Sequence, residues 1–589
     1  MRLERNLAHM SAGSFNLEPQ WVIVGTDEEL AAGIASEVGI SDVAARLLVN
    51  RGIKSAEEAE EFLTPSLDNL HDPMLLPDIE RGVERLERAI DKKERILVHG
   101  DYDVDGVTST ALIVRTLRLL GADVHPRLPH RRKEGYGIKP KVVDEAREEG
   151  VSLIITTDCG ITAFETVKRA KEHGIDVIIT DHHEPGDRLP EAAAVIDPLR
   201  KDSRYPFPYL AGVGVALKFA QALIRRLGLK DKRFNDRSYV GHYLDLASLG
   251  TIADVVPLTG ENRIIARFGL KALGESKKIG IRTLVERIGL AERVPTSYHV
   301  GYILGPRINA VGRMGDAALA LDLMLTGDER LAVELVEVLE RYNRERQQEQ
   351  AKMLKKAEEI MGEIDLDENP VLVIASEDWN TGVVGIVAGR LVDVYYRPSV
   401  VLSLDRDKNI AHGSARSIDA FNMIEALNEC SDILINAGGH AKAAGLTLPA
   451  DKVDEFRERL ADFAAERISP EDLMPRVEVE AELRASEITE SLQREIERME
   501  PFGECNPEPM FVTRGLEVAE VWRVGQDGAH LKMRVLGDGT MLEAIAFGRG
   551  EMESEIRRGS VVDLCYTLKA DKFNGSEYVQ MTVEDMKPH

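Results

Sequence analysis

Four short runs, three of them apolar and one extended, alternate with helix-like stretches over residues 96–180, and this alternation restricts the fold more than any other feature of the sequence. The runs occupy 96–99, 122–128, 153–157 and 177–180, and the helical stretches between them occupy 107–120, 140–149 and 161–173. Strands that alternate with helices in this way form a largely parallel, doubly wound sheet. The sequence therefore predicts an α/β domain, to which we assign residues 81–325.

Polar motifs follow three of these apolar runs, at the point where each predicted strand ends. The segment 99–106 reads HGDYDVDG, Asp158 follows the third run, and the triplet 181–183 reads DHH. In open α/β sheets, binding sites form beyond the carboxyl ends of the strands. The acidic and imidazole side chains of the three motifs are therefore expected to meet in space.

The first motif places Asp101, Asp103 and Asp105 at alternating positions, as in the calcium loop of an EF-hand. That loop needs a bidentate Glu at its twelfth position, which here is Leu112, and it follows a helix where this motif follows a predicted strand. The calcium-loop interpretation is therefore excluded. A solvated acidic turn is the other alternative, but carboxylates beside apolar runs repel one another unless a cation lies between them.

The later motifs add imidazoles and further carboxylates to this candidate metal site. A set that includes His182 and His183 but no thiolate favours Mn²⁺ or Mg²⁺ over structural zinc. Asp254 is an isolated acid in an apolar stretch and is a candidate for a further ligand, whereas Asp245 is expected on a helix face, with a supporting role as the alternative. None of the four cysteines forms a CxxC pair, and we expect Cys159 to be a small packed residue and not a nucleophile.

The rest of the chain divides into segments of different character. Residues 1–80 are predicted to be a mostly helical N-terminal region, and 326–365 a long connecting helix, because 328–361 contain no Gly or Pro. We expect its basic side chains to form a solvated face, with a strand-binding surface as the alternative. Residues 366–470 again alternate strand and helix, with glycine-rich loops expected at Gly413 and Gly438–Gly439. Short alternating strands and turn signals in 471–589 predict a small β-barrel.

The net charge of −26 argues against a general nucleic-acid-coating protein, which would present a basic face. It does not exclude an enzyme that draws a strand into a local basic groove, since bound cations reverse the local field. No stretch approaches the roughly 18 apolar residues that cross a bilayer, and the N-terminus does not have the pattern of a secretion signal. We therefore expect a cytoplasmic protein without membrane attachment.

Several motifs together resemble the DHH phosphoesterase superfamily. HGDYDVDG, TTDCG, DHH and GTIADVVPL are similar to its four motifs, and RINAVGRMGD (307–316), GSARS (413–417) and AGGHAKAAG (437–445) extend the resemblance. With the C-terminal barrel, the pattern resembles the single-strand-specific 5′→3′ DNA exonucleases of that superfamily, from about residue 90 to the end. The resemblance implies a DHH domain, a DHHA1-type α/β domain and an OB-type barrel.

The resemblance also implies a ligand set for two metal ions, Mn²⁺ or Mg²⁺. One ion would be held by His99, Asp103 and Asp158, and the other by Asp105, Asp158, His182 and Asp254, with Asp158 shared. His183 would lie beside the centre and support the ligands or the phosphate, and Asp101 is not expected to be a direct ligand. The residues implied to be catalytic are Asp103, Asp105, Asp158, His182 and His183.

An enzyme that starts at a strand end must also recognise the terminal phosphate, and the forked donors of arginine suit this task. The candidates are Arg131, Arg307, Arg313 and Arg416, with an ordinary ion pair as the alternative for each. Arg307 and Arg416 are favoured because they are expected in loops rich in Gly and small residues. Three further substrate-binding candidates lie in the matching segments: Ser414, Gly439 and His440.

The predicted barrel is expected to grip a single strand by charge and stacking. The candidate platforms are Trp522, Phe547, Tyr566, Phe573 and Tyr578, most of which must be core residues in so small a domain. One departure from the family pattern is Cys505, which replaces a glycine in the segment PFGECNP (501–507).

The resemblance implies a processive exonuclease that releases nucleoside monophosphates from single-stranded DNA in recombination and repair, in cooperation with single-strand-binding protein. The alternatives are a DHH phosphodiesterase of short oligonucleotides and a non-catalytic DNA-binding scaffold. The intact set of candidate ligands argues against the scaffold.

Overall fold

The computed structural model describes residues 19–131, 133–228, 231, 235–291, 293–366, 368–573 and 576–589. The side chains of 571–573, 576 and 577 are outside this description. The chain forms two compact units. One contains Glu61–Arg346 and Glu500–Pro507, and the other contains Met1–Glu60, Gln347–Met499 and Glu508–His589.

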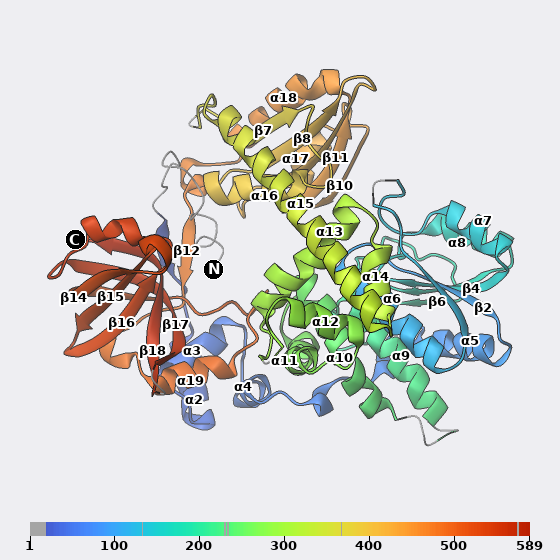
Figure 1. Cartoon of the computed structure of the whole chain (residues 1–589), viewed down its shortest axis with the longest axis horizontal. Coiled ribbons are helices and arrows are strands. Elements are labelled where there is room, and N and C mark those ends of the chain that lie inside the picture. The colour runs from blue at the N-terminus through green and yellow to red at the C-terminus, as the bar shows by residue number, and fades with distance from the viewer. Residues whose placement is uncertain are drawn as a thin grey trace. The chain divides into compact units, whose positions relative to one another are not determined.

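The first unit is built on a five-stranded parallel sheet, with strand order β3-β2-β4-β5-β6 (Figure 1). The strands are β2 (Arg95–His99), β3 (Asp123–Arg127), β4 (Val151–Thr157), β5 (Asp176–Thr180) and β6 (Ala194–Ile196). The four expected strands are confirmed, whereas the three-residue β6 is too short to stand out in the sequence. The strand order changes direction between β2 and β4, so the sheet has its topological switch point there.

Helices cover both faces of this sheet, which confirms the doubly wound fold. Ile96 and Val98 of β2 pack in a core with α5 (Ile79–Asp91), α6 (Val104–Leu119), α9 (Gly212–Gly228) and α10 (Asp236–Ala253). Leu97, whose side chain points to the opposite face, packs in a second core with α7 (Pro140–Glu148) and α8 (Phe164–Glu172). Strands that are buried on both faces have no polar side, which explains the continuous apolar runs.

Further helices follow the sheet in the first unit, and the long helix α15 begins in this unit and extends beyond it. They are α11 (Gly260–Gly274), α12 (Ile279–Arg287), the π-helix η3 (His299–Leu304), α13 (Gly305–Met314), α14 (Ala318–Leu325) and α15 (Glu329–Met361). The 33-residue α15 confirms the predicted long helix. Its side chains Arg341 and Arg344 form i,i+4 ion pairs with Glu345 and Glu340, as expected of a solvated charged face. The strand-binding alternative stays a prediction.

The second unit contains a mixed sheet of order β10-β11-β9-β8-β7 (Figure 1). Its strands are β7 (Leu372–Ser376), β8 (Ser399–Asp405), β9 (Ile410–Arg416), β10 (Asn436–His440) and β11 (Ala443–Leu448). Its helices are α16 (Val384–Tyr395), α17 (Met423–Glu429) and α18 (Val453–Ala465).

The glycine-rich segments of this mixed sheet are strands, so the prediction of loops was wrong. Gly413 lies in β9, where a Cβ atom would come within 3.0 Å of a Leu446 methyl carbon. Gly438 and Gly439 lie in β10, and a Cβ on Gly439 would meet Ala444. Close neighbouring atoms explain the glycines at 413 and 439, and Gly439 also has a φ of 144°, which favours glycine.

The C-terminal segment of the second unit forms a closed β-barrel, as predicted. The strands β14 (Phe511–Val524), β15 (His530–Gly537), β16 (Thr540–Ala546), β18 (Ser576–Pro588) and β17 (Val561–Phe573) pair in that order, and β17 pairs back to β14. The two-residue β13 (Ala481–Glu482) adds to β14, and α19 (Glu490–Arg498) precedes the barrel. A closed five-stranded barrel is the architecture of an OB fold.

The candidate stacking residues of the barrel differ in exposure. Tyr566 is fully buried and its hydroxyl contacts the Thr513 hydroxyl at 2.7 Å, so it is one of the candidates expected to be core residues and is not a platform. Phe547 is 43% exposed and Trp522 is half-buried, as is Tyr578. The side chain of Phe573 lies outside the described residues.

The described part of the N-terminal segment is mainly helical, with α2 (Glu28–Val38), α3 (Asp42–Asn50) and α4 (Ala56–Leu63). It also contains a short strand that the sequence did not predict, β1 (Gln20–Ile23), which pairs in parallel with β12 (Arg476–Val479). Within the described residues, no helix has the length and hydropathy needed to span a membrane.

Cys505 adopts a positive φ of 57° in a tight turn closed by the bridge between Gly503 and Asn506. This backbone conformation explains why glycine suits the position, since only glycine adopts it without strain.

Candidate metal centre

The register of the parallel sheet aligns the ends of the three strands that carry the polar motifs. His99 pairs with Thr156 of β4, and Thr157 pairs with Thr180 of β5. The next residues along β4 and β5 are Asp158 and Asp181, so both carboxylates leave the sheet at the same edge. The switch point between β2 and β4 lies at this edge, where the helices that follow the two strands diverge.

The segment after β2 turns directly into a helix, and its aspartates occupy the first turn. Asp103 is the N-cap of α6, and its carboxylate accepts a hydrogen bond from the Gly106 amide at 3.0 Å. Asp105 is buried and accepts hydrogen bonds from the amides of Gly212 (2.6 Å) and Val213 (2.8 Å) at the start of α9. Helix N-termini carry partial positive charge, which favours both carboxylates there.

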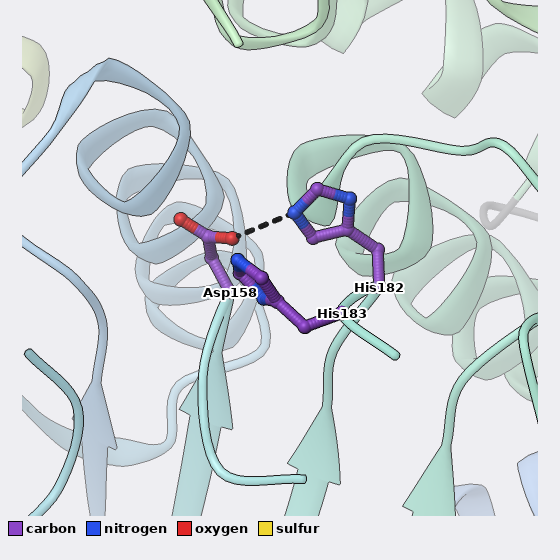
Figure 2. Close-up of side chains that lie close together, drawn as sticks. All are labelled: Asp158, His182 and His183. Atoms are coloured by element: carbon purple, nitrogen blue, oxygen red, sulfur yellow. Dashed lines mark ion pairs between the residues drawn. The ribbon is translucent and has the colours of Figure 1, made fainter. Parts of the chain in front are cut away.

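Asp158 and His182 face each other across the neighbouring strand ends (Figure 2). The Nε2 atom of His182 lies 3.1 Å from Oδ1 of Asp158, 3.6 Å from Oδ2 of Asp254 and 3.8 Å from Oδ2 of Asp105. Asp158 holds a left-handed backbone with a φ of 60°. Strain of this kind in a residue other than glycine is found at functional sites. Asp254 is the C-cap of α10, and its contact with His182 brings a carboxylate from a distant part of the sequence into the site.

Two glycines allow this close approach, and the motif analysis did not single them out as site residues. A Cβ atom on Gly212 would lie 2.8 Å from Cβ of Asp158 and 2.9 Å from Oδ2 of Asp105. A Cβ atom on Gly250, in α10, would lie 2.7 Å from Oδ1 of Asp105. Gly250 begins the segment GTIADVVPL that also carries Asp254, which was the only sequence signal for it.

Burial and mutual repulsion govern the electrostatics of the carboxylates. Desolvation, with the neighbouring Asp105, raises the pKa of Asp158 well above its usual value, and desolvation raises the pKa of Asp254 likewise. Desolvation and the adjacent Asp103 raise the pKa of Asp105 to about 7. Several carboxylates placed this closely are unfavourable as anions unless positive charge is added between them.

The imidazoles of His99 and His182 are neutral and have nitrogen atoms without hydrogen-bond partners among the described residues. Desolvation lowers the pKa of His99 to about 3 and that of His182 to about 4. Among the described residues, neither ring nitrogen of His99 has a hydrogen-bond partner, and neither does Nε2 of His182 or Oδ1 of Asp158. Buried polar atoms are normally satisfied. Neutral imidazole nitrogens and carboxylate oxygens without partners are the donor set expected of a metal site.

The ligand atoms form three overlapping groups, within each of which they all lie within 4.8 Å of one another. The first group places Asp158 with both histidines, and the second places Asp105 with His182 and Asp254. The third unites Asp103 and Asp158 with Asp101, which the sequence analysis did not expect to be a ligand. Desolvation and the adjacent Asp103 raise the pKa of Asp101, whose buried Oδ1 has no hydrogen-bond partner among the described residues.

Asp181, in contrast, is saturated with hydrogen bonds and orients His183. Its carboxylate accepts from the amides of Ile161 (2.9 Å) and His182 (2.8 Å), and contacts Nδ1 of His183 at 2.7 Å. Burial opposes the charge on Asp181, but the two histidines and the Ile161 amide together outweigh it and keep the pKa of Asp181 low. Burial likewise opposes the charge on His183, yet the contact with Asp181 raises its pKa to about 9.

Two other candidates from the sequence have structural surroundings. Cys159 is fully buried, as expected of a packed residue. Asp245 lies on α10 and forms a buried ion pair with Lys278, whose Nζ is 2.8 Å from Oδ1 of Asp245. Ser276 also donates to Asp245 at 2.6 Å. Because these partners satisfy its carboxylate, Asp245 belongs to the helix packing and not to the groups of metal-ligand atoms.

Three arginine candidates lie in the same unit as the centre. The Arg131 guanidinium carbon stacks 4.8 Å from the ring centroid of Tyr102, a residue of the first motif. Arg307 and Arg313 lie on helix α13, so the prediction of a loop for Arg307 was wrong. Nε of Arg307 donates to Glu340 at 2.7 Å, which is the ion-pair alternative stated for it.

The remaining substrate-binding candidates lie in the mixed sheet of the second unit. Ser414 and Arg416 are on β9, and Nη1 of Arg416 donates to the Ser414 hydroxyl at 3.0 Å. Arg416 is therefore in a strand and not in the expected loop. Gly439 and His440 are exposed on the neighbouring strand β10.

Three family models match this chain, in the order of the domains described above. They are the DHH family N-terminal domain over residues 95–251, the DHHA1 domain over 368–466 and the RecJ OB domain over 479–585. Proteins named single-stranded-DNA-specific exonuclease RecJ are similar over most of their length. The protein from Bacillus subtilis is 39% identical, and the match covers 96% of this chain and 70% of the Bacillus protein. The protein from Escherichia coli is 34% identical, and the match covers 92% of this chain and 95% of the Escherichia protein.

Solved structures show the same similarity. The crystal structure of RecJ from Thermus thermophilus in complex with Mn²⁺ matches with a TM-score of 0.82 and 31% identity, over 97% of this chain and 80% of that one. The complex of the same protein with Mg²⁺ matches with a TM-score of 0.76, over 97% of this chain and 79% of that chain. Mn²⁺ and Mg²⁺ are the two cations that the sequence analysis favoured.

Proposed function

This chain belongs to the RecJ family of metal-dependent exonucleases, and on that premise we propose that it hydrolyses single-stranded DNA from the 5′ end and releases mononucleotides. The observation that carries the proposal is the meeting of one neutral imidazole with three carboxylates, around Nε2 of His182. Such a donor set suits the charge of a divalent cation and leaves ligand positions for phosphate oxygens.

Two ions are proposed, with the ligands divided as the family resemblance implies. His99, Asp103 and Asp158 would hold one ion, and Asp105, Asp158, His182 and Asp254 the other. The unpartnered atoms of His99, Asp158 and His182 support this division. Asp101 lies close enough to Asp103 and Asp158 to be a further candidate ligand for the first ion.

Bound divalent cations would supply Lewis-acid polarisation of the phosphodiester and a lower pKa for the attacking water. The chain itself provides the preorganisation for this chemistry. The amides of Gly212 and Val213 fix both oxygens of Asp105, and Asp181 fixes the ring of His183. His183 is thereby positioned to donate a hydrogen bond to a phosphate oxygen of the substrate. Preorganised donors of this kind stabilise charge that develops in the transition state.

In the unit that contains the metal centre, Arg131 and Arg313 are proposed to recognise the terminal phosphate. The proposed substrate-binding residues of the other unit are Arg416, Ser414, Gly439 and His440. Arg131 is the strongest candidate in the unit that contains the metal centre, because it stacks on Tyr102 of the first motif. Arg307 is a weaker candidate, since Glu340 already neutralises its charge. The OB barrel would grip the following nucleotides through exposed aromatic side chains such as Phe547.

The proposed setting is DNA recombination and repair in the cytoplasm, with single-strand-binding protein as a partner. The support for this setting is the similarity to proteins named as single-stranded-DNA-specific exonucleases over more than nine-tenths of the chain. A net charge of −26 would limit non-specific binding to DNA, which suits an enzyme that engages strand ends.

The test is digestion, with Mn²⁺, of single strands labelled at either end, with and without a 5′-phosphate. Wild type is compared with Asp103→Ala, and with Asp187→Ala as the matched control, because Asp187 is a solvent-exposed carboxylate paired only loosely with Lys201 at 3.4 Å. We expect loss of 5′ label as mononucleotide in wild type and Asp187→Ala, and no digestion by Asp103→Ala. Arg131→Ala is expected to reduce the preference for a 5′-phosphate while metal binding is retained.

Digestion from the 3′ end, or activity that survives in Asp103→Ala, would refute the mechanism. Hydrolysis confined to strands of a few nucleotides would favour the phosphodiesterase of short oligonucleotides. Full-length strands in every lane, despite bound metal, would favour the non-catalytic scaffold.

A further inference from the structure

Tyr136 stands at the edge of the metal centre, in the connection between β3 and α7. It lies between Gly135 and Gly137, which have positive φ angles of 73° and 75°. These two left-handed glycines form a narrow turn that extends the tyrosine side chain toward the strand ends. The residue remains 43% exposed, so its position is not explained by burial in a core.

The tyrosine hydroxyl contacts two residues of the centre at once. Its oxygen lies 3.1 Å from Nδ1 of His183 and 3.3 Å from the backbone carbonyl oxygen of Asp158. The ring also packs edge-on against the His183 ring, with centroids 5.5 Å apart and an interplanar angle of 67°. Asp158 and His183 follow different strands, β4 and β5, so the hydroxyl bridges two strand ends.

The donors and acceptors available fix which group donates in each of these two hydrogen bonds. The Asp158 carbonyl only accepts, so the tyrosine hydroxyl donates its single proton there. Its oxygen then accepts from Nδ1 of His183, which therefore carries a proton that it shares with the Asp181 carboxylate at 2.7 Å. A proton held at Nδ1 by two acceptors fixes the rotation of the ring. Both contacts use Nδ1 and leave Nε2 of His183 for the substrate.

We propose that Tyr136 is a positioning residue that fixes the ring of His183 for the substrate phosphate and anchors the strained turn at Asp158. The consequence for the reaction rests on the proposed function. Tyr136 touches neither the phosphate nor the ions in this assignment, and it acts through His183. A tyrosine that merely fills space would contribute through its ring, and removal of the hydroxyl would then have no effect.

The test is a double-mutant cycle that combines Tyr136→Phe with His183→Ala, because such cycles isolate the coupling between two residues. Tyr136→Phe removes the hydroxyl and keeps the ring contact. The matched control is Tyr302→Phe, which removes the hydroxyl of a tyrosine that is 61% exposed and stacks on Tyr298. For each protein, kcat and KM on 5′-phosphorylated single strands are measured with Mn²⁺, together with the Tm of the metal-free protein.

We expect Tyr136→Phe to lower kcat about tenfold in the wild-type background, the effect of one hydrogen bond, with KM within about twofold. In the His183→Ala background the same substitution should lower kcat less than about threefold, since the partner is gone. The Tm of the metal-free protein should fall by about 2 °C in the wild-type background and by less in His183→Ala. Tyr302→Phe should change neither kcat nor Tm.

An unchanged kcat in Tyr136→Phe, or an equal loss in both backgrounds, would overturn the proposal. If wild type does not digest DNA, the proposed function fails, but the Tm cycle still decides the coupling between Tyr136 and His183. Equal shifts in Tm in the two backgrounds would then refute the positioning role.

Discussion

A single methyl group added to helix α10 should disable the metal centre. In Gly250→Ala, the new Cβ atom would lie 2.7 Å from Oδ1 of Asp105 and 2.8 Å from a methyl carbon of Val213, and it would also meet the Thr108 hydroxyl. These neighbours are buried, and amides at the start of α9 hold the Asp105 carboxylate. The methyl group therefore fits only if the carboxylate or α10 moves.

The stability change follows from two opposing effects. Overpacking a tightly packed site costs about 1–3 kcal/mol, whereas the better helix propensity of alanine contributes about 1 kcal/mol in the other direction. We therefore expect Gly250→Ala to lower the free energy of unfolding by about 0–2 kcal/mol. Gly241 lies in the same helix with no atom near its would-be Cβ. Gly241→Ala should thus raise the free energy of unfolding by about 1 kcal/mol.

The effect on activity should exceed the effect on stability. Relief of the contact with Oδ1, from 2.7 Å to the 3.4 Å of ordinary van der Waals contact, requires a shift of about 0.7 Å. Because a misplacement of about 1 Å costs up to about 100-fold in rate, we expect Gly250→Ala to lose about 10–100-fold in kcat and to bind Mn²⁺ more weakly.

Urea denaturation, calorimetric titration with Mn²⁺ and digestion of labelled single strands, applied to wild type and both variants, measure these quantities. If Gly250→Ala matches Gly241→Ala in metal affinity and kcat, then the close packing of Gly250 on Asp105 does not shape the centre.

Three further substitutions test the structure away from the reaction. Cys505→Gly should raise the free energy of unfolding, measured with urea, by about 0.5–1 kcal/mol. A φ of 57° costs an L-residue about 1–2 kcal/mol, and glycine loses part of that gain because its unfolded chain is more flexible. An unchanged free energy of unfolding would show that the turn is not strained. Lys278→Met should lower the free energy of unfolding by about 3–5 kcal/mol, since Asp245 is left charged and buried. The double variant Lys278→Met with Asp245→Leu should recover most of that loss. Weaker Mn²⁺ binding in the double variant would contradict the exclusion of Asp245 from the metal centre. Burial alone would raise the pKa of Asp78, but hydrogen bonds from Arg200 and a backbone amide outweigh it and hold the pKa below its usual value. A carboxyl with a lowered pKa stabilises the folded state fully above about pH 4 and loses this contribution as the pH falls through the folded pKa. The deficit of Asp78→Asn in urea should therefore be constant from pH 7 to about pH 5 and shrink below it, and a deficit that persists at pH 3 would refute this.

The sequence was sufficient to predict where the centre lies, because its determinants are local. An apolar run that ends in a polar motif locates the end of a buried strand, and parallel strands bring those ends to one edge. Asp158 and His182 were therefore predicted to meet, and they face each other at 3.1 Å. Asp254 was identified by a different signal, namely a lone acid in an apolar stretch of a helix.

What the sequence did not reveal depends on tertiary packing. Gly250 has a role only because Asp105 of another helix packs against it. Glycine-rich segments were interpreted as loops, yet Gly413 lies in a strand, where the Leu402 and Leu446 side chains leave no space for a Cβ atom. Arg307 was favoured as a phosphate ligand because it was expected in a loop, and its ion pair was not foreseen because the partner, Glu340, lies 33 residues away on the long helix α15. Tyr136 was overlooked because its two contacts come from different strand ends.

The central claim is that the side chains at the edge of the first sheet hold two divalent cations. It is tested most directly by anomalous diffraction at the manganese absorption edge, from crystals of the protein grown with Mn²⁺ and from matched crystals of Asp158→Asn. In wild type we expect two anomalous peaks about 3.5–4 Å apart, with Asp158 between them, and in Asp158→Asn the loss of at least one. A wild-type map with no peak among His99, Asp158 and His182, or with manganese bound only elsewhere, would contradict the account.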